Sequence, residues 1–359
     1  MVIHMHEGNS DAYKPSSKNF IGKKKRILVA EDSALMRAFL RDFLTSEGFD
    51  VITVRNGKEA LDVVSKLSPD AAILDINMPI MDGLSVLREF VRMRIPSVMF
   101  SHLTVESSST TMEALEIGAI DFVTKPSPPY SDINNVKKEL LSKLKIAIVS
   151  KNIPSIRRNF IGRPLSFEAH QENLAKKVIL VAASTGGPSM IKSILSDLPR
   201  RLGASILIVQ HMPPIFTKAF AASLSSTSFL QVKEAEYGEL IYENRVYVAP
   251  GDFHMEVMTG ARILLHKGEK VNFVRPSADT LFFSAARHFG SSTLAVILSG
   301  MGSDGAKGAL AIKNVGGHVI VQDEATSVVY GMPKAAIEVG AVDEVLSIDE
   351  IPKRIVDLL

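Results

Sequence analysis

The sequence predicts an α/β protein made of two doubly wound domains in series. Two stretches, about residues 25–150 and 178–359, each alternate short apolar runs typical of strands with amphipathic runs of helical spacing. A polar, proline-interrupted stretch predicts a linker over residues 151–177, and we expect residues 1–24 to be a flexible N-terminal segment. A chain of 359 residues with 46% hydrophobic composition is long enough for two cores.

Composition and charge exclude several classes of protein. Forty-one Lys and Arg against 39 Asp and Glu leave a net charge of +2, so we expect no nucleic-acid partner. The absence of cysteine excludes disulfides and thiolate chemistry. No apolar run approaches the roughly 20 residues that span a bilayer, and the first 20 residues lack the apolar core of a signal peptide. We therefore expect a cytoplasmic protein without membrane insertion.

The first domain is expected to contain five strands and intervening helices. Its predicted strands cover residues 26–30, 50–54, 71–76, 97–101 and 119–125. Helical spacing over residues 34–48 ends at a glycine, and residues 134–149 are expected to form the last helix of the domain. In such sheets, ligands bind at the carboxyl ends of the strands, so the residues that follow each strand are the candidate site residues.

Three acidic residues fall at these strand ends. Glu31 and Asp32 follow the first strand, and Asp75 ends the third. Asp32 alone is equally compatible with a helix N-cap. Three clustered carboxylates repel one another unless a hard cation neutralises them, so the group predicts an oxygen-ligand Mg²⁺ site. Ser101 after the fourth strand and Lys125 after the fifth add a hydroxyl and an amine to the same edge.

Together these residues resemble the receiver domain of two-component response regulators, a flavodoxin-like fold, over about residues 25–150. The segment NMPIMDG at residues 77–83 fits the expected phosphorylation-site loop, which turns at Pro79 and Gly83. The resemblance implies that Asp75 accepts a phosphoryl group from a histidine kinase. A carboxylate that attacks phosphorus requires a metal and a cation to offset the accumulating charge.

The resemblance also assigns roles to the surrounding residues. It implies that Mg²⁺ is held by Asp32, Asp75 and the backbone carbonyl of Asn77, with Glu31 in the outer acidic pair. It further implies contacts from Ser101 and Lys125 to the phosphoryl oxygens, and a switch aromatic at Phe122. An aromatic residue in a strand is equally compatible with a place in the core.

The second domain begins with a strand that runs into Ser184. Residues 178–184 read as a strand, and residues 185–195 begin a helix with Pro188 near its first turn. Ser184 is compatible with an N-cap, or with a nucleophile lifted on a tight turn. Its surroundings approach the G-x-S-x-G elbow of hydrolases, with Ala182 in the first glycine position.

Two further strand ends favour the nucleophile. His211 ends the next strand, and Asp304 follows another apolar run over residues 293–298. Each is ordinary alone, because strand-end histidines are often structural and an aspartate between glycines suits a turn. Serine, histidine and aspartate at one sheet edge form the combination that acyl transfer requires. Their chain order differs from that of α/β-hydrolases, which predicts a separate fold.

Six segments of this domain resemble the chemotaxis protein-glutamate methylesterases over nearly all of residues 178–355. They are AASTGGP, VQHMPPIFTKAFA, VAPGDFHM, RPSADTLF, SGMGSDGAKG and VVYGMPKAAIEVG. The resemblance implies a mostly parallel sheet and cofactor-independent hydrolysis of glutamate methyl esters on methyl-accepting chemotaxis receptors, with deamidation of receptor glutamines. It also implies that the unphosphorylated receiver covers the active-site edge.

The resemblance implies that Ser184, His211 and Asp304 take the triad roles. Thr185 and Met301 lie where the family lines the site, and the Met301 backbone is expected to donate to the oxyanion. The Met301 side chain is equally compatible with packing. Ala182 departs from the family, which commonly has glycine there.

Two alternatives remain open at this point. A response regulator with a non-catalytic output domain would require a basic recognition helix, whereas the sequence continues with strand and helix alternation. An esterase that acts on a small metabolite fits the same residues, and only the family resemblance favours a receptor substrate.

Overall fold

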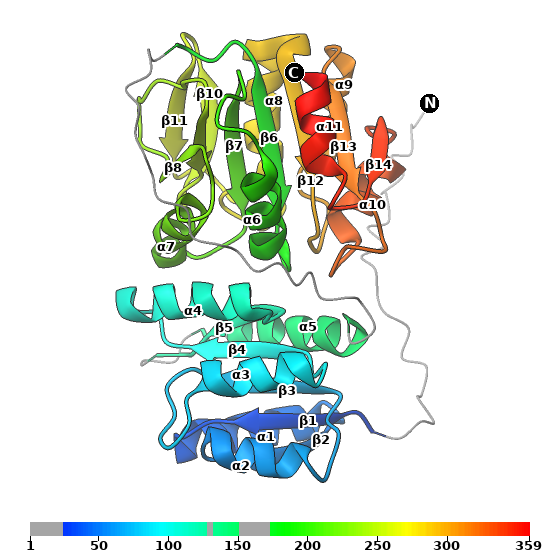
Figure 1. The fold of residues 1–359 in the computed structure, drawn as a ribbon. Helices are drawn as coiled ribbons and strands as arrows, with labels where there is room; N and C mark the ends of the chain where they lie inside the picture. Colours follow the sequence, from blue (N-terminus) through cyan, green and yellow to red (C-terminus); the bar gives the residue numbers. More distant parts are fainter. Residues whose placement is uncertain (1–23, 128–131, 151–172) are drawn as a thin grey trace, which may run out of the picture.

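The computed structural model describes residues 24–127, 132–150 and 173–359. The expected N-terminal segment and most of the expected linker lie outside these residues. The described chain forms two α/β domains, one above the other in Figure 1. None of the helices in the described ranges is both long enough and apolar enough to cross a membrane.

The N-terminal domain contains a five-stranded parallel sheet with the strand order β2-β1-β3-β4-β5. Its strands are β1 Arg26–Ala30, β2 Asp50–Val54, β3 Ala71–Asp75, β4 Ser97–Ser101 and β5 Asp121–Thr124. Its helices are α1 Ala34–Ser46, α2 Gly57–Val64, α3 Gly83–Arg92, α4 Val105–Ile117 and α5 Ile133–Ser150. Apolar side chains of α1 and α5 pack on one face of the sheet, and those of α2, α3 and α4 pack on the other.

The C-terminal domain contains a seven-stranded parallel sheet with the order β14-β13-β12-β6-β7-β9-β8. Its strands are β6 Val178–Ala183, β7 Ser205–Gln210, β8 Gln231–Glu234, β9 Arg245–Val248, β12 Thr293–Ile297, β13 His318–Gln322 and β14 Glu344–Leu346. A separate antiparallel hairpin pairs β10 His254–Met258 with β11 Arg262–His266.

Helices cover both faces of this second sheet. They are α6 Gly187–Asp197, α7 Pro214–Ser225, α8 Ala278–Phe289, the short 3₁₀ helix η1 Gly290–Ser292, α9 Ala306–Asn314, α10 Gly331–Glu338 and α11 Ile351–Leu358. Side chains of α6, α7 and α11 pack on one face, and those of α8, α9 and α10 pack on the other. The predicted fold class, two doubly wound α/β domains, is thereby confirmed.

Strand order places the two candidate sites. In the first sheet the chain leaves β1 toward β2 on one side and returns to β3 on the other, so a switch point lies between β1 and β3. In the second sheet the chain proceeds from β6 to β7 and later returns to β12 on the opposite side of β6. Parallel sheets bind ligands at such points, and the predicted site residues follow these strands.

The helix predicted over residues 34–48 shows how closely the predicted element bounds match the observed ones. It ends at Ser46, two residues before Gly48, whose φ of 92° only glycine adopts readily. The strands predicted at 26–30, 50–54 and 97–101 have the observed bounds. The other predicted strands of the first domain differ by one or two residues at their ends, where element assignment is least defined.

Candidate functional site

Ser184 occupies a tight turn between β6 and α6. Its backbone N–H donates to the Ser299 carbonyl at 3.1 Å, and its own carbonyl accepts from Gly187 at 2.8 Å. The N-cap of α6 is Gly186, with a φ of 80° and no side-chain capping bond. The N-cap alternative for Ser184 is therefore wrong, and its hydroxyl is not committed to the helix.

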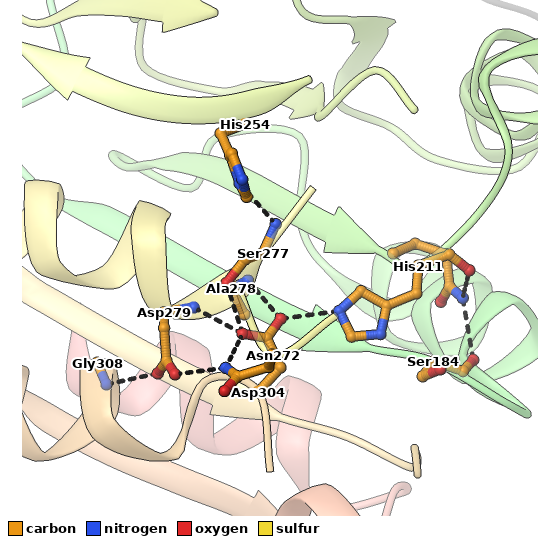
Figure 2. A network of polar contacts seen from close by, with 10 residues as sticks. Ser184, His211, His254, Asn272, Ser277, Ala278, Asp279, Asp304 and Gly308 are labelled. Carbon is orange, nitrogen blue, oxygen red and sulfur yellow. Dashed lines mark hydrogen bonds and ion pairs between the residues drawn. The ribbon is translucent and has the colours of Figure 1, made fainter. Parts of the chain in front are cut away.

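His211 and Asp304 meet at the same edge of the sheet. His211 directly follows β7, and its Nε2 lies 2.8 Å from Oδ2 of Asp304. Figure 2 shows the imidazole between Asp304 and Ser184, which leaves Nδ1 as the ring nitrogen available to the serine. Among the described residues no hydrogen bond joins the Ser184 hydroxyl to the ring. Catalytic hydrogen bonds are often long in structures without substrate.

The Asp304 carboxylate is held by the N-terminus of helix α8. Its oxygens accept hydrogen bonds from the backbone N–H groups of Ala278, at 2.6 Å, and Asp279, at 3.2 Å, and from the Ser277 hydroxyl at 2.6 Å. Burial alone would raise the pKa of Asp304, but these donors and His211 lower it to about 2. Asp304 is thus an anion at neutral pH, and it fixes the orientation of the imidazole.

Gln210 joins the serine and histidine turns and was not predicted from sequence. This buried side chain donates from Nε2 to the carbonyls of Ser184, at 2.9 Å, and His211, at 3.2 Å. Gln210 requires glycine at position 187, because a Cβ there would lie 2.2 Å from the Gln210 Oε1. The sequence feature that could have indicated its role is a glutamine at the end of an otherwise apolar strand.

Asn272 is a second residue that sequence reasoning missed. It lies in the loop between β11 and α8, and its amide donates to Oδ1 of Asp304 at 3.0 Å and to Oδ2 of Asp279 at 2.8 Å. Nothing in the loop sequence pointed to it, because its position depends on how the loop packs against α8.

Thr185 and Met301 lie where the second domain meets the first. The Thr185 hydroxyl donates to Oδ2 of Asp121 at 2.7 Å, and the Met301 sulfur accepts from the Ser142 hydroxyl at 3.2 Å. The Met301 side chain is 53% exposed and is not part of the esterase core. In the described part of the chain the Met301 N–H donates to no acceptor, as an oxyanion donor requires. The Ala182 methyl is buried in the core below the turn.

The three acids of the first domain lie together, as predicted. Carboxylate oxygens of Glu31, Asp32 and Asp75 are all within 4.8 Å of one another. The Lys125 amine lies 2.8 Å from Oε2 of Glu31 and 2.9 Å from Oδ2 of Asp75. The N-cap of α1 is Ser33, which accepts from the N–H of Met36, so the capping alternative for Asp32 is wrong.

One lysine does not balance three carboxylates. Burial, together with the neighbouring Asp75 charge, raises the pKa of Glu31 to about 7, and burial also raises the pKa of Asp75. Hard oxygen donors with excess negative charge are the ligand set that Mg²⁺ prefers, so the cluster fits this ion. Asp32 is exposed and provides the open side.

The remaining predicted residues surround this cluster. The Asn77 N–H donates to Oδ1 of Asp75 at 3.3 Å, and Gly83 fits against the Asp75 backbone, where a Cβ would lie 2.1 Å from its carbonyl oxygen. The buried Ser101 hydroxyl, at the end of β4, accepts from Thr111 at 3.1 Å. Phe122 is buried, and its ring stacks at a tilt on Phe216 of the second domain, with 4.4 Å between centroids.

Comparison with known proteins identifies the family of both domains. Residues 27–136 match the response regulator receiver domain, and residues 179–355 match the CheB methylesterase family. A protein-glutamate methylesterase/protein-glutamine glutaminase of Pyrococcus horikoshii is 43% identical over 94% of this chain and 94% of its own. This chain belongs to that family. The protein of the same name from Archaeoglobus fulgidus is also 43% identical, over 93% of this chain and 98% of its own.

A solved structure gives the same relationship for the second domain. The CheB methylesterase catalytic domain of Thermotoga maritima is 47% identical, with a TM-score of 0.50, and the match covers 51% of this chain and 98% of that one. The predicted resemblance and the prediction of a protein-glutamate methylesterase with an N-terminal receiver domain are thus confirmed at the level of the family.

Proposed function

We propose that this methylesterase hydrolyses glutamate methyl esters on chemotaxis receptors with Ser184 as nucleophile, His211 as general base and Asp304 as its orienting anion. The observation that carries the proposal is the 2.8 Å hydrogen bond between His211 and Asp304 at the sheet edge where Ser184 turns into α6. This arrangement supplies the parts that acyl transfer requires.

The reaction follows from the positions of these atoms. His211 removes the Ser184 proton through Nδ1 as the hydroxyl oxygen attacks the ester carbonyl, and the charge on the resulting imidazolium is offset by Asp304. The Met301 N–H stabilises the oxyanion, and the imidazolium then protonates the departing methoxide, which leaves as methanol. Water, activated by His211, cleaves the acyl-enzyme and leaves a glutamate carboxylate. Attack on a glutamine amide releases ammonia by the same steps.

We further propose that Asp75 is the phosphoryl acceptor of the receiver domain and that a chemotaxis histidine kinase is the donor. Asp32, Asp75 and the Asn77 carbonyl would hold Mg²⁺, with Glu31 beside them. The ion, when bound, offsets charge on the transferring phosphoryl group. Lys125 and Ser101 lie at the ends of the adjacent strands and would bind the phosphoryl oxygens, which draws Lys125 away from the carboxylates it contacts before phosphorylation.

The receiver is proposed to inhibit the esterase by covering its active-site edge. The contacts that support this come from α4, β5 and α5: Asp121 with Thr185, Ser142 with Met301, Phe122 with Phe216, and Glu116 with Lys192 and Ser223. Two of these contacts involve Thr185, which follows the proposed nucleophile, and Met301, the proposed oxyanion donor. Figure 1 shows α4 lying across the ends of α6 and α7.

Strand β5 links the phosphorylation site to this interface. Asp121 and Phe122 on this strand contact the esterase, and Lys125, directly after it, contacts Asp75. Lys143 of α5 donates to the Phe122 carbonyl at 2.6 Å and pairs with Asp121 at 3.1 Å, so these residues move as a unit. A phosphoryl group that pulls Lys125 would displace both contacts, and an equilibrium shift of a few kcal/mol suffices to release the domain.

The substrate class is tested by methanol release. We expect the full-length protein with a phosphodonor to release methanol from membranes that carry methylated receptors, much faster than from soluble glutamate γ-methyl ester. Hydrolysis of the small ester alone would favour the metabolite esterase instead. Absence of hydrolysis on both substrates would favour the non-catalytic output domain.

A further inference from the structure

Within the described ranges, Asn272 makes the one hydrogen bond to the Asp304 carboxylate that comes from neither His211 nor the start of α8. Oδ2 of Asp304 accepts from His211 and Ala278, whereas Oδ1 accepts from Ser277, Asp279 and Asn272. Ser277, Ala278 and Asp279 are consecutive and move with the helix. Asn272 holds the carboxylate from a separate loop, as Figure 2 shows.

The backbone at Asn272 is built to present this side chain. Val271 and Val274 exchange backbone hydrogen bonds of 3.2 and 3.0 Å, so Asn272 and Phe273 are the two central residues of a tight turn. Both have positive φ, 51° and 66°. Asparagine tolerates this conformation, but phenylalanine does not favour it. The Phe273 side chain is 95% exposed, so no packing of its own compensates for the strained backbone.

A second buried carboxylate explains why an amide stands here. Asp279 is 2% exposed and accepts from the Gly308 N–H at 2.7 Å and from Asn272 at 2.8 Å. Burial, with a further contribution from the Asp304 charge, raises the pKa of Asp279. An amide nitrogen carries two N–H groups and no charge, so it can donate to both acids and hold them apart.

We infer that Asn272 is a positioning residue of the ester hydrolysis, whose amide fixes the Asp304 carboxylate toward His211 and separates it from Asp279. This inference rests on the proposed triad. Loss of the amide removes one of the donors that hold Oδ1 of Asp304, so the carboxylate is less firmly oriented and supports the imidazolium less well in the transition state. The effect is expected in kcat rather than in substrate binding, because Asn272 lies behind Asp304 and not beside the ester.

Two other titratable or charged side chains near the His211–Asp304 pair, His254 and Arg275, already have partners of their own. His254 of β10 accepts from the Ser277 N–H through Nδ1 at 3.2 Å and donates to the Glu269 carbonyl at 2.8 Å, and burial lowers its pKa. Arg275 is paired with Asp252 at 2.5 Å. The carboxylate that faces Asp304 from α8 is Asp279, and the two acids share the Asn272 amide.

The experiment uses full-length protein with saturating phosphodonor and receptor membranes that carry radiolabelled methyl esters. Asn272→Gly removes the amide without backbone strain, because glycine accepts a φ of 51°. We expect kcat to fall about tenfold, the effect of losing one hydrogen bond to a charged group, with KM and the melting temperature nearly unchanged. Phe273→Gly is the matched control in the same turn and should retain full activity.

Asn272→Asp adds a pH test that a purely structural role would not pass. A third acid beside Asp304 and Asp279 repels both carboxylates and raises their pKa values, so the acidic limb of the kcat/KM profile should move to higher pH. Wild-type kcat in Asn272→Gly together with an unshifted limb in Asn272→Asp would overturn the inference while Ser184→Ala still abolishes release. Release retained by Ser184→Ala would instead reject the triad, and the role of Asn272 with it.

Discussion

The acid cluster of the receiver and the proposed triad of the esterase both lie at the carboxyl ends of strands in parallel sheets, yet their charges are balanced in opposite ways. In the receiver, Glu31, Asp32 and Asp75 share one buried lysine, and burial raises the pKa of two of the acids. In the esterase, the Asp304 carboxylate receives five hydrogen bonds from the described residues, and those from His211, Ser277 and Ala278 help to lower its pKa to about 2.

This difference indicates how each site is controlled. A cluster with unbalanced charge changes its contacts when a cation or a phosphoryl group is added, so it suits a switch. A carboxylate that is already fully solvated by fixed donors has no second arrangement of similar energy. We therefore expect the esterase site to be regulated by being covered, and the contacts of Asp121 and Ser142 lie at Thr185 and Met301, which we propose to line that site.

The largest expected effect is loss of the nucleophile or the base. Ser184→Ala and His211→Ala should each lower methanol release by about 10⁴-fold or more, because triad members act as a unit. Asp304→Asn should lower it less, since its carboxylate assists and does not attack. Circular dichroism should show an intact fold in each variant. Near-wild-type release by Ser184→Ala would remove the basis of the comparison.

On the receiver side, Asp75→Asn should abolish labelling by phosphorylated kinase or acetyl phosphate. Chelation of Mg²⁺ should do the same to the wild type, because the carboxylates alone cannot offset the charge of the phosphoryl group. Labelling is followed with ³²P, and Asp75→Asn should also lose the stimulation of methanol release by phosphodonor. Persistent labelling of the variant would place the acceptor elsewhere.

A smaller effect is expected from weakening the interface itself. Glu116 on α4 pairs with the buried Lys192 of the esterase at 2.6 Å, whereas Glu113 on the same helix pairs with Arg88 of the receiver. Glu116→Gln should raise the activity of the unphosphorylated protein by about tenfold, since a hydrogen bond between charged groups contributes about 1.5–3 kcal/mol.

Glu113→Gln is the matched control, because it removes the same charge from α4 without a contact to the esterase. Its unphosphorylated activity should equal that of the wild type. Equal rates for the two variants would indicate that the Glu116 contact does not contribute to inhibition.

The smallest effect concerns acid stability. The pKa of Asp304 is lowered from 3.8 to about 2 in the folded state, so its contribution is fully present above pH 4 and is lost as the pH falls from about 4 to 2. We expect the difference in unfolding free energy between wild type and Asp304→Asn to shrink by about 2 kcal/mol over this range. Urea titrations at several pH values measure it, and a constant difference would contradict the assigned pKa.

Sequence patterns located the strand-end residues of both sites, because parallel strands bring their carboxyl ends together whatever the loops do. Asp75, Ser184, His211 and Asp304 were proposed as site residues in this way, and the structure brings Ser184, His211 and Asp304 to one edge of the sheet. Asn272 was not, since its contact depends on a turn at positive φ packing against the first turn of α8.

Local sequence patterns also could not predict the residues that form the interface between the receiver and the esterase. The sequence suggested that the receiver covers the esterase, but the pairing of Asp121 with Thr185 joins residues 64 positions apart in different domains. Phe122 was predicted as a switch or a core aromatic; it is buried in the core, and its ring also lies against Phe216 at the domain boundary. Such contacts depend on how the surfaces of two folded domains fit together, which cannot be inferred from a local sequence pattern.

The central claim is that the receiver restrains a finished esterase and that phosphorylation lifts the restraint. Initial rates on one receptor preparation test it for three forms: the unphosphorylated full-length protein, the same protein with phosphodonor, and a fragment that begins near residue 170. The catalytic domain of the Thermotoga maritima relative has been crystallised alone, which supports use of the fragment. We predict that the fragment is faster than the unphosphorylated protein and that phosphodonor narrows or reverses the gap. A fragment no faster than the unphosphorylated protein would contradict the claim.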